Sequence, residues 1–221
     1  MPEASSSTRL LVFAKAPRPG EVKTRLVPLL GSEGAAELHA ELVERTLSMA
    51  AGCAIGPVDL YAAPATDPFL RACAARHGCG VHEQAAGDLG ARMLAAFAQA
   101  LETAPGAILI GTDCPAMTVS HIHDAARALL HDDSVITPTE DGGYALIGLS
   151  RRPTTRLFEG IAWSSDQVMH ETRQRLRELE YSCTELATLW DIDRPADYQR
   201  FIAIDPSFRG NSPGSRGSYI S

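Results

Sequence analysis

The pattern of apolar and polar residues switches repeatedly between short apolar runs and longer segments with helical spacing. The apolar runs predict strands over 10–13, 58–62, 81–83, 107–111, 134–138 and 144–149. The helical spacing predicts helices over 33–51, 67–77, 88–102, 119–130, 167–179 and 195–202. Strands that alternate with helices in this way predict βαβ units, and therefore a three-layer α/β/α domain with a mostly parallel central sheet.

Two of these segments have the clearest patterns. The run 107–111 is uninterrupted by polar residues, which is typical of a central strand buried on both faces. The segment 88–102 places Leu89, Met93 and Phe97 on one face, with Asp88 positioned to cap the helix. The pattern leaves the direction of the strand over 144–149 open.

Length and composition predict one domain. The chain has 221 residues, of which 45% are hydrophobic and 21% charged, and this suits a single core. We expect the domain to span 8–204. The ends, 1–7 and 205–221, are polar and rich in small residues, and we expect them to be disordered.

Charge and cysteine usage narrow the class of protein. A formal charge of −7 and a pI near 5.5 argue against a nucleic-acid or membrane-surface binder. No apolar run approaches the roughly 20 residues of a membrane span, and the first residues do not resemble a signal peptide. Five scattered cysteines without a C-x-x-C pair suit reduced thiols. We therefore expect a cytoplasmic protein.

The loop after the first predicted strand is a local exception to the acidic composition. Its cations are Lys15, Arg18, Lys23 and Arg25. A cationic loop with proline and glycine between a strand and a helix is the arrangement by which α/β proteins hold nucleotide phosphates. A solvated turn would explain any single cation, but four together favour a phosphate site.

Two further loops are expected at the same edge of the sheet, because ligands of such sheets bind beyond the carboxyl ends of the strands. Asp113 follows the most apolar strand, where a carboxylate needs a cation or hydrogen-bond donors. It could instead cap the following helix or tighten a turn. The turn Asp141-Gly142-Gly143 suits a close approach of the backbone to a ligand, although an ordinary hairpin would also explain the glycines.

Near the end of the chain, Asp191 and Asp193 lie two residues apart in an extended segment before a predicted helix. Such spacing puts both carboxylates on one face, where they could complete a cation site or cap the helix. The sequence has neither a P-loop nor G-x-G-x-x-G, and no G-x-S-x-G motif indicates a covalent nucleophile.

Four segments together resemble a bacterial family of GT-A-fold proteins. They are Phe-Ala-Lys-x-Pro-x-Pro-Gly-x-Val-Lys-Thr-Arg-Leu at 13–26, Ile-Gly-Thr-Asp-Cys-Pro at 110–115, Pro-Thr-Glu-Asp-Gly-Gly-Tyr at 138–144 and Asp-Ile-Asp-x-Pro at 191–195. The family is usually described as nucleotide-diphospho-sugar transferases, and some members are tied to arsenosugar biosynthesis. The wider superfamily also holds nucleotidyltransferases such as the molybdenum-cofactor guanylyltransferases.

The resemblance implies roles for individual residues. Asp113 would bind Mg²⁺ or Mn²⁺, with Asp193 or Asp191 as a second carboxylate. Asp113, Asp141 and Lys23 would form the catalytic set. The implied nucleotide and phosphate contacts are Ala14, Lys15, Pro19, Gly20, Lys23, Arg25, Asp88, Thr112, Gly142 and Gly143.

The function expected from this resemblance is a metal-dependent transfer from a nucleotide-diphospho-sugar to a small acceptor, with Asp141 as general base. The single carboxylate of Thr112-Asp113-Cys114, where a GT-A glycosyltransferase normally has Asp-x-Asp, favours the alternative of nucleotidyl transfer from a nucleoside triphosphate. A catalytically silent nucleotide-binding regulator is a third interpretation. The base, the sugar and the choice between monomer and homodimer stay open.

Overall fold

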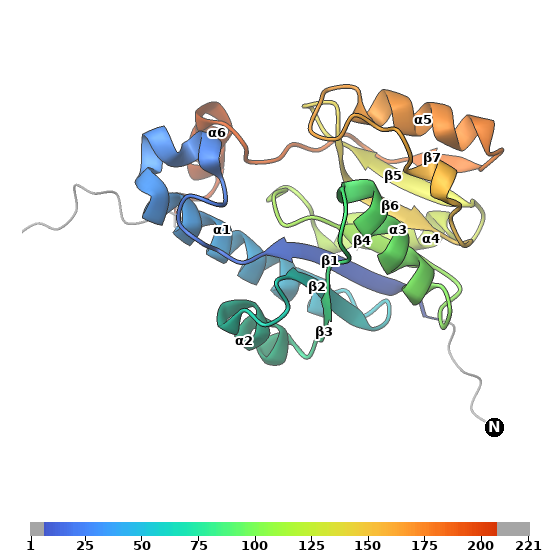
Figure 1. The fold of residues 1–221 in the computed structure, drawn as a ribbon, viewed down its shortest axis with the longest axis horizontal. Helices are drawn as coiled ribbons and strands as arrows, with labels where there is room; N and C mark the ends of the chain where they lie inside the picture. The colour runs from blue at the N-terminus through green and yellow to red at the C-terminus, as the bar shows by residue number, and fades with distance from the viewer. Residues whose placement is uncertain (1–6, 207–221) are drawn as a thin grey trace, which may run out of the picture.

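A seven-stranded sheet runs through the centre of the structure, a computed structural model that describes residues 7–206 (Figure 1). The strand order is β3-β2-β1-β4-β6-β5-β7. The strands are β1 (Arg9–Lys15), β2 (Val58–Ala63), β3 (Gly80–Glu83), β4 (Ala107–Ile110), β5 (Ser134–Pro138), β6 (Tyr144–Leu149) and β7 (Cys183–Glu185). Every pairing is parallel except those of β6, which runs antiparallel to both β4 and β5. The predicted mostly parallel sheet is therefore confirmed.

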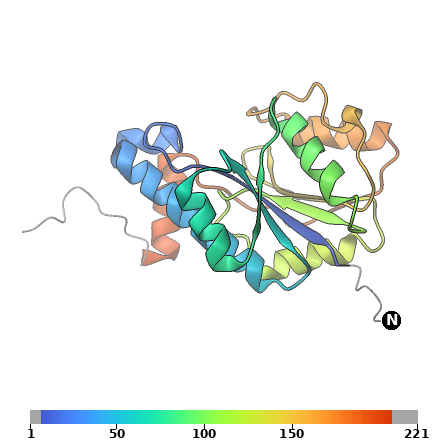
Figure 2. The same cartoon turned by 60° about the horizontal axis from the view of Figure 1, so that its bottom comes forward.

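Helices cover both faces of this sheet (Figures 1 and 2). One face packs against α1 (Val27–Gly52), α2 (Pro68–His77) and α4 (Val119–Ala128). The other face packs against α3 (Leu89–Ala100), α5 (Val168–Glu178) and the short helix η2 (Thr155–Leu157). A short helix η1 (Thr24–Leu26) leads into α1, and α6 (Pro195–Ile204) packs against the N-terminal half of α1. The fold is the single three-layer α/β/α domain that the sequence predicts.

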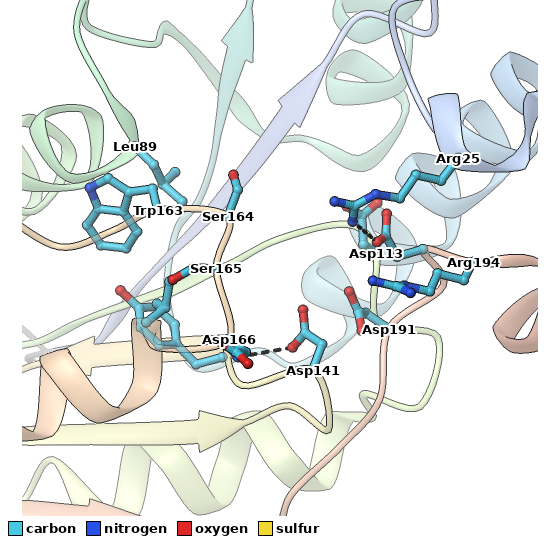
Figure 3. A pocket seen from close by; sticks show the side chains of 14 residues that line it. Arg25, Leu89, Asp113, Asp141, Trp163, Ser164, Ser165, Asp166, Asp191 and Arg194 are labelled. Atoms are coloured by element: carbon cyan, nitrogen blue, oxygen red, sulfur yellow. Dashed lines mark hydrogen bonds and ion pairs between the residues drawn. The ribbon is translucent and has the colours of Figure 1, made fainter.

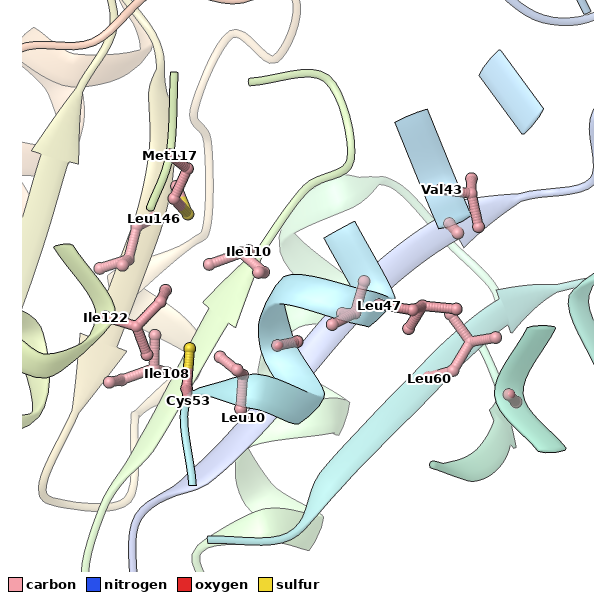
Figure 4. Close-up of a cluster of buried hydrophobic side chains, with 14 of the residues drawn as sticks. Leu10, Val43, Leu47, Cys53, Leu60, Ile108, Ile110, Met117, Ile122 and Leu146 are labelled. Atoms are coloured by element: carbon pink, nitrogen blue, oxygen red, sulfur yellow. The ribbon is translucent and has the colours of Figure 1, made fainter. Parts of the chain in front are cut away.

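The central strands are apolar at every position because both of their faces are buried. Leu10 and Ile108 face α1 and α4, where Figure 4 shows them among other apolar side chains. Leu11 and Leu109, the next residues along the same strands, face α3 and α5 instead. This alternation fixes the register of the sheet, since a slip by one residue would exchange the two faces.

Two elements differ from the sequence prediction, and a third has a direction that the prediction left open. The first helix begins at Val27 rather than near residue 33, with a break at Gly31, whose φ of 73° and ψ of 169° are not helical. The strand β7 was not predicted, because its three residues carry no apolar alternation. The direction of β6, which the pattern left open, is antiparallel.

The expected disordered ends, 1–7 and 205–221, lie outside the described residues except for positions 7, 205 and 206. The boundaries 8–204 stay a prediction. Within residues 7–206, no helix combines the length and the apolar character of a membrane span.

Candidate functional site

Segments from four parts of the chain meet at one edge of the sheet. The loops after β1, β4 and β5 leave the carboxyl ends of these strands, and β6 starts at the same edge because it is antiparallel. The segment before α6 joins them through hydrogen bonds from Glu140 N to Leu189 O (3.0 Å) and from Ile192 N to Asp113 O (2.8 Å). This convergence is where sheets of this type bind ligands.

A pocket of about 550 Å³ opens between these segments. Figure 3 shows Arg25, Asp113, Asp191 and Arg194 on one side and Trp163 on the opposite side. The pocket residues are Arg25, Leu89, Asp113, Asp141, Gly143, Tyr144, Trp163, Ser164, Ser165, Asp166, Val168, Asp191, Asp193 and Arg194. They include five carboxylates and two guanidinium groups, so the lining is acidic.

Lys23 lies beneath this pocket and its side chain is only 5% exposed. Its ammonium lies 2.6 Å from Asp113 Oδ1 and donates a hydrogen bond to Ile192 O at 2.5 Å. The backbone of Lys23 is left-handed, with φ 47° and ψ 39°, a conformation that is uncommon outside glycine. Lys23 thus ties together the loops after β1 and β4 and the segment before α6.

Asp113 keeps a solvent-facing carboxylate, 52% exposed, above Lys23. Loss of solvation acts to raise the pKa of Asp113, but the Lys23 ammonium outweighs it, with smaller contributions from His39 and Lys15. The pKa therefore lies below its ordinary value, and Asp113 is an anion at neutral pH. An exposed anionic oxygen over a buried cation is a suitable ligand for a hard metal ion.

The other loop cations face outward. Arg25 is exposed and pairs with Asp193 across the pocket rim. Arg18 lies 3.9 Å from Glu21, and Lys15 is exposed at the end of β1. Arg25 lines the pocket, whereas Lys15 and Arg18 do not.

The turn after β5 holds Asp141 in one orientation. Its Oδ1 accepts hydrogen bonds from Thr139 Oγ1 (2.6 Å) and from Gly143 N (3.0 Å). Within residues 7–206, Oδ2 has no hydrogen bond. Gly142 has φ 90°, and a Cβ at this position would lie 2.3 Å from Asp166 O, so the turn needs glycine to let the 161–167 loop approach.

The carboxylates are close enough to affect one another. The pKa of Asp191 is raised to about 6, first by burial and then by the negative charges of Asp141 and Asp113. Across residues 7–206, no group of three His, Cys, Asp or Glu side chains is arranged to hold a metal ion, and Asp113 and Asp193 each face a cation. The oxygen donors and the excess of negative charge nevertheless fit a hard divalent cation by chemical type.

The structure brings some of the predicted residues together and separates others. The predicted residues that line the pocket are Arg25, Asp113, Asp141, Gly143, Asp191 and Asp193. Those that lie outside its lining are Ala14, Lys15, Pro19, Gly20, Lys23, Asp88, Thr112 and Gly142. Of these, Asp88 caps α3 by accepting from Ala91 N at 2.8 Å, and Thr112 is buried.

Most residues on the side of the pocket opposite Asp113 were not predicted from the sequence. From its sequence context, Trp163 could belong to the core, an acceptor pocket or an interface, and the structure puts it in the pocket. The remaining unpredicted lining residues are Leu89, Tyr144, Ser164, Ser165, Asp166, Val168 and Arg194. The sequence indicated the 161–167 loop only indirectly, through the pair of glycines at 142–143. These glycines predict that another group approaches the backbone of the turn closely.

His39 is a second residue that sequence reasoning missed. It lies on the face of α1 that packs under the site, and its side chain is buried. Its Nε2 lies 3.0 Å from Lys15 O and its Nδ1 lies 3.9 Å from Asp113 Oδ1. Burial lowers the pKa of His39, although the negative charge of Asp113 acts to raise it. The lowered pKa favours the neutral ring.

Comparisons with known proteins give a family and a set of related folds. The family model described as "Uncharacterized protein conserved in bacteria (DUF2064)" matches residues 46–165. No curated protein sequence matches the chain.

Among solved structures, the chain is similar to a candidate nucleotide-diphospho-sugar transferase from Desulfovibrio desulfuricans G20. The identity is 27% and the TM-score 0.81, over 94% of this chain and 92% of that chain. It is also similar in fold to 4-diphosphocytidyl-2C-methyl-D-erythritol synthase from Anaerococcus prevotii DSM 20548, with 9% identity and a TM-score of 0.62, over 90% and 98%.

A third similar structure is glucosyl-3-phosphoglycerate synthase from Mycobacterium tuberculosis in complex with Mn²⁺, UDP and glucosyl-3-phosphoglycerate. The identity is 11% and the TM-score 0.52, over 90% of this chain and 77% of that chain. The structural neighbours thus include sugar-nucleotide transferases as well as nucleotidyltransferases.

Proposed function

The chain belongs to the DUF2064 family of proteins conserved in bacteria, and we propose that it is a divalent-metal-dependent transferase that uses a nucleotide-diphospho-sugar as glycosyl donor. The observation that carries this proposal is one pocket with Asp113 and Asp191 on one side, Trp163 on the other and Asp141 between them. Such a pocket has room for a charged leaving group and for an acceptor. The likeness to the Desulfovibrio protein over nearly the whole chain supports the same activity.

The acidic lining explains why a metal ion is needed. The excess of carboxylates would repel a diphosphate. Its binding therefore requires a cation that lies between the carboxylates and the diphosphate and attracts both. Asp113 would hold the ion, with Asp191 or Asp193 as a second ligand. When bound, Mg²⁺ or Mn²⁺ would neutralise charge that develops on the diphosphate leaving group.

The chain's own cations would act on the phosphates. Arg25 lines the pocket, and Lys15 and Arg18 lie outside its lining on exposed side chains. The charges of all three would add to that of the ion. Lys23 has a different role, because it is buried and paired: it keeps Asp113 ionised and in place.

Asp141 is the proposed general base. Its Oδ1 is fixed by Thr139 and Gly143, which leaves Oδ2 available for an acceptor hydroxyl. The acceptor oxygen would form a bond to the anomeric carbon of the sugar, the bond from that carbon to the diphosphate oxygen would break, and the hydroxyl proton would pass to Asp141. The nucleoside diphosphate would leave with the electron pair.

Trp163 and Leu89 would form the wall of the pocket against which the sugar and the acceptor lie. An indole ring offers an apolar face of the kind against which sugar rings pack, and the hydroxyl groups of Ser164 and Ser165 lie next to it.

Nucleotidyl transfer is the second candidate function. It is favoured by the single carboxylate of the 112–114 loop and by structural neighbours that are nucleotidyltransferases. In that reaction a substrate phosphate would attack the α-phosphorus of a triphosphate, pyrophosphate would leave, and Asp141 would not need to act as a base.

Product analysis separates the two reactions. The protein is incubated with Mn²⁺ and a panel of UDP-, GDP- and CDP-sugars, or with the four nucleoside triphosphates, and released nucleoside diphosphate and pyrophosphate are measured. We expect release of nucleoside diphosphate from one sugar donor, and its loss in Asp141→Asn but not in Asp124→Asn, a carboxylate on α4 outside the pocket. Pyrophosphate release from a triphosphate alone would favour nucleotidyl transfer.

A further inference from the structure

The two sides of the pocket differ in charge. Both guanidinium groups, those of Arg25 and Arg194, lie on the side of Asp113 (Figure 3). The residues toward the other side, which we call the acceptor side, are Leu89, Trp163, Ser164, Ser165 and Asp166. They include one carboxylate and no lysine, arginine or histidine. A ligand on this side therefore meets negative charge without a compensating cation.

Asp166 supplies the negative charge of the acceptor side. The residue is exposed, and its Oδ1 accepts a hydrogen bond from Gln167 Nε2 at 2.9 Å. Within residues 7–206, no cation forms an ion pair with it. Asp141 adds a second carboxylate at the edge of this side. A phosphate or carboxylate group bound here would be repelled by both, whereas an ammonium group would be attracted.

Trp163 gives the pocket a ring surface rather than a hydrogen-bond donor. Its Nε1 is buried and makes no hydrogen bond with any described residue. The neighbouring part of the ring packs against α3 at Gly90, where a Cβ would lie only 2.8 Å from Trp163 Cζ2. An indole N–H would favour an anion, but the pocket does not meet it. The ring face instead attracts cations.

The hydroxyl group of Ser165 also acts as an acceptor toward the pocket. Its Oγ donates its proton to Ala162 O at 2.7 Å and accepts a hydrogen bond from Gln167 N at 3.2 Å. The proton of this hydroxyl is therefore not available to a ligand. Like Asp166, Ser165 suits a ligand group that donates hydrogen bonds.

We propose that the acceptor is a small hydroxyl compound that carries a positively charged amine, with the ammonium group bound by the Asp166 carboxylate and the Trp163 ring face. The inference rests on the proposed glycosyl transfer and names its acceptor class. The acceptor hydroxyl forms the bond to the anomeric carbon and its proton passes to Asp141, so the ammonium group takes no part in the bond changes. An acceptor that carries a phosphate is disfavoured on this side.

Two sets of compounds, each with one skeleton and three charges, test the acceptor class. The first set is 3-amino-1,2-propanediol, glycerol and glycerate, and the second is glucosamine, glucose and glucuronate. The full-length protein is given Mn²⁺ and a panel of UDP-, GDP- and CDP-sugars at pH 7, and released nucleoside diphosphate and glycosylated product are measured. In at least one set we expect kcat/KM for the amine to exceed that for the neutral member about tenfold, with the acid lowest.

Asp166→Asn tests the residue that carries the preference. The amide keeps an oxygen for Gln167 and removes the charge, so the unfolding midpoint should not change. We expect the ratio of kcat/KM between the amine and the neutral member to fall about tenfold. Asp124→Asn, on α4 outside the pocket, should keep the wild-type ratio.

The outcomes separate the acceptor class from the proposed function. If nucleoside diphosphate is released, to water or to any compound, but the acid is used as well as the amine or none of the six compounds is used, the acceptor class is wrong and the donor reaction stands. A preference for the amine that survives in Asp166→Asn would overturn the role of Asp166. If no donor releases nucleoside diphosphate, the proposed function fails and the acceptor class fails with it.

Discussion

The Lys23 ammonium lies 2.6 Å from Asp113 Oδ1, in an ion pair that links the loop after β1 to the loop after β4. The cation is buried and the anion faces the pocket, so the two partners are not equivalent. Lys23 sets the charge state and position of Asp113, and a ligand in the pocket meets Asp113 alone.

Replacing Lys23 by methionine should destabilise the fold. The change leaves the carbonyl of Ile192 and the carboxylate of Asp113 without their donor, and we expect a loss of about 2 kcal/mol in the free energy of unfolding. Denaturant unfolding measures it. Arg18→Met is the control, because it removes an exposed cation of the same loop and should change stability by less than about 0.5 kcal/mol. Equal effects of the two substitutions would contradict the structural role of Lys23.

Replacing Asp191 by asparagine should stabilise the metal-free protein at neutral pH. The folded pKa of about 6 is above the ordinary value, so ionised Asp191 opposes folding, and stability falls as pH rises through 6. We expect Asp191→Asn to raise the unfolding free energy by about 1 kcal/mol at pH 8 and to have no effect at pH 4. Thermal unfolding in the presence of a chelator measures both. A variant that is less stable than the wild type at pH 8 would contradict a raised pKa for Asp191.

Replacing Gly142 by alanine should disrupt the turn that supports Asp141. The left-handed backbone and the 2.3 Å approach of a new Cβ to Asp166 O both oppose the substitution, and we expect a loss of about 2 kcal/mol. Gly52→Ala is the control, since a Cβ there has nothing within 4 Å and no positive φ to oppose it. If both variants unfold at the same denaturant concentration, the close approach of the 161–167 loop is wrong.

Glu44 gives a test of pH dependence away from the site. Burial acts to raise its pKa, but hydrogen bonds from Cys73, Arg76 and His77 outweigh this and lower the pKa to about 2. A lowered pKa stabilises the fold above the ordinary value near 4.5, and this stability is lost as pH falls toward 2.

The substitution Glu44→Gln should therefore cost about 1 kcal/mol at pH 7 and clearly less at pH 3. Urea unfolding at the two pH values measures the difference. Glu37→Gln, at an exposed position of the same helix, should have no effect at either pH. A cost for Glu44→Gln that does not change with pH would mean that its charge is not what stabilises the fold.

Local pattern predicted most of the fold because the central strands must be apolar on both faces. The run 107–111 was placed correctly as a buried strand for this reason, and the cap at Asp88 marked the start of α3. Two features were harder to predict. The strand β7 is stabilised by pairing with β5 rather than by a pattern in its own three residues, and the early start of α1 depends on a break at Gly31.

The candidate site was predictable where a residue type is unusual for its position. Asp113 stood out after an apolar strand, and the glycines at 142–143 indicated a close approach. The burial of Lys23 and the position of His39 could not be read from the sequence, because both depend on contacts between segments far apart in the chain. A lysine in a cationic loop and a histidine in a helix are each ordinary in their local pattern.

The most direct test of the central claim is a titration of Mn²⁺, followed by electron paramagnetic resonance, in the presence of UDP, GDP or CDP. The account predicts that one diphosphate and the wild-type protein together remove Mn²⁺ from solution more strongly than either does alone. It also predicts that Asp113→Asn abolishes this cooperation and that Asp124→Asn preserves it. Cooperation that survives in Asp113→Asn, or that occurs with none of the diphosphates, would contradict a metal–diphosphate site at Asp113.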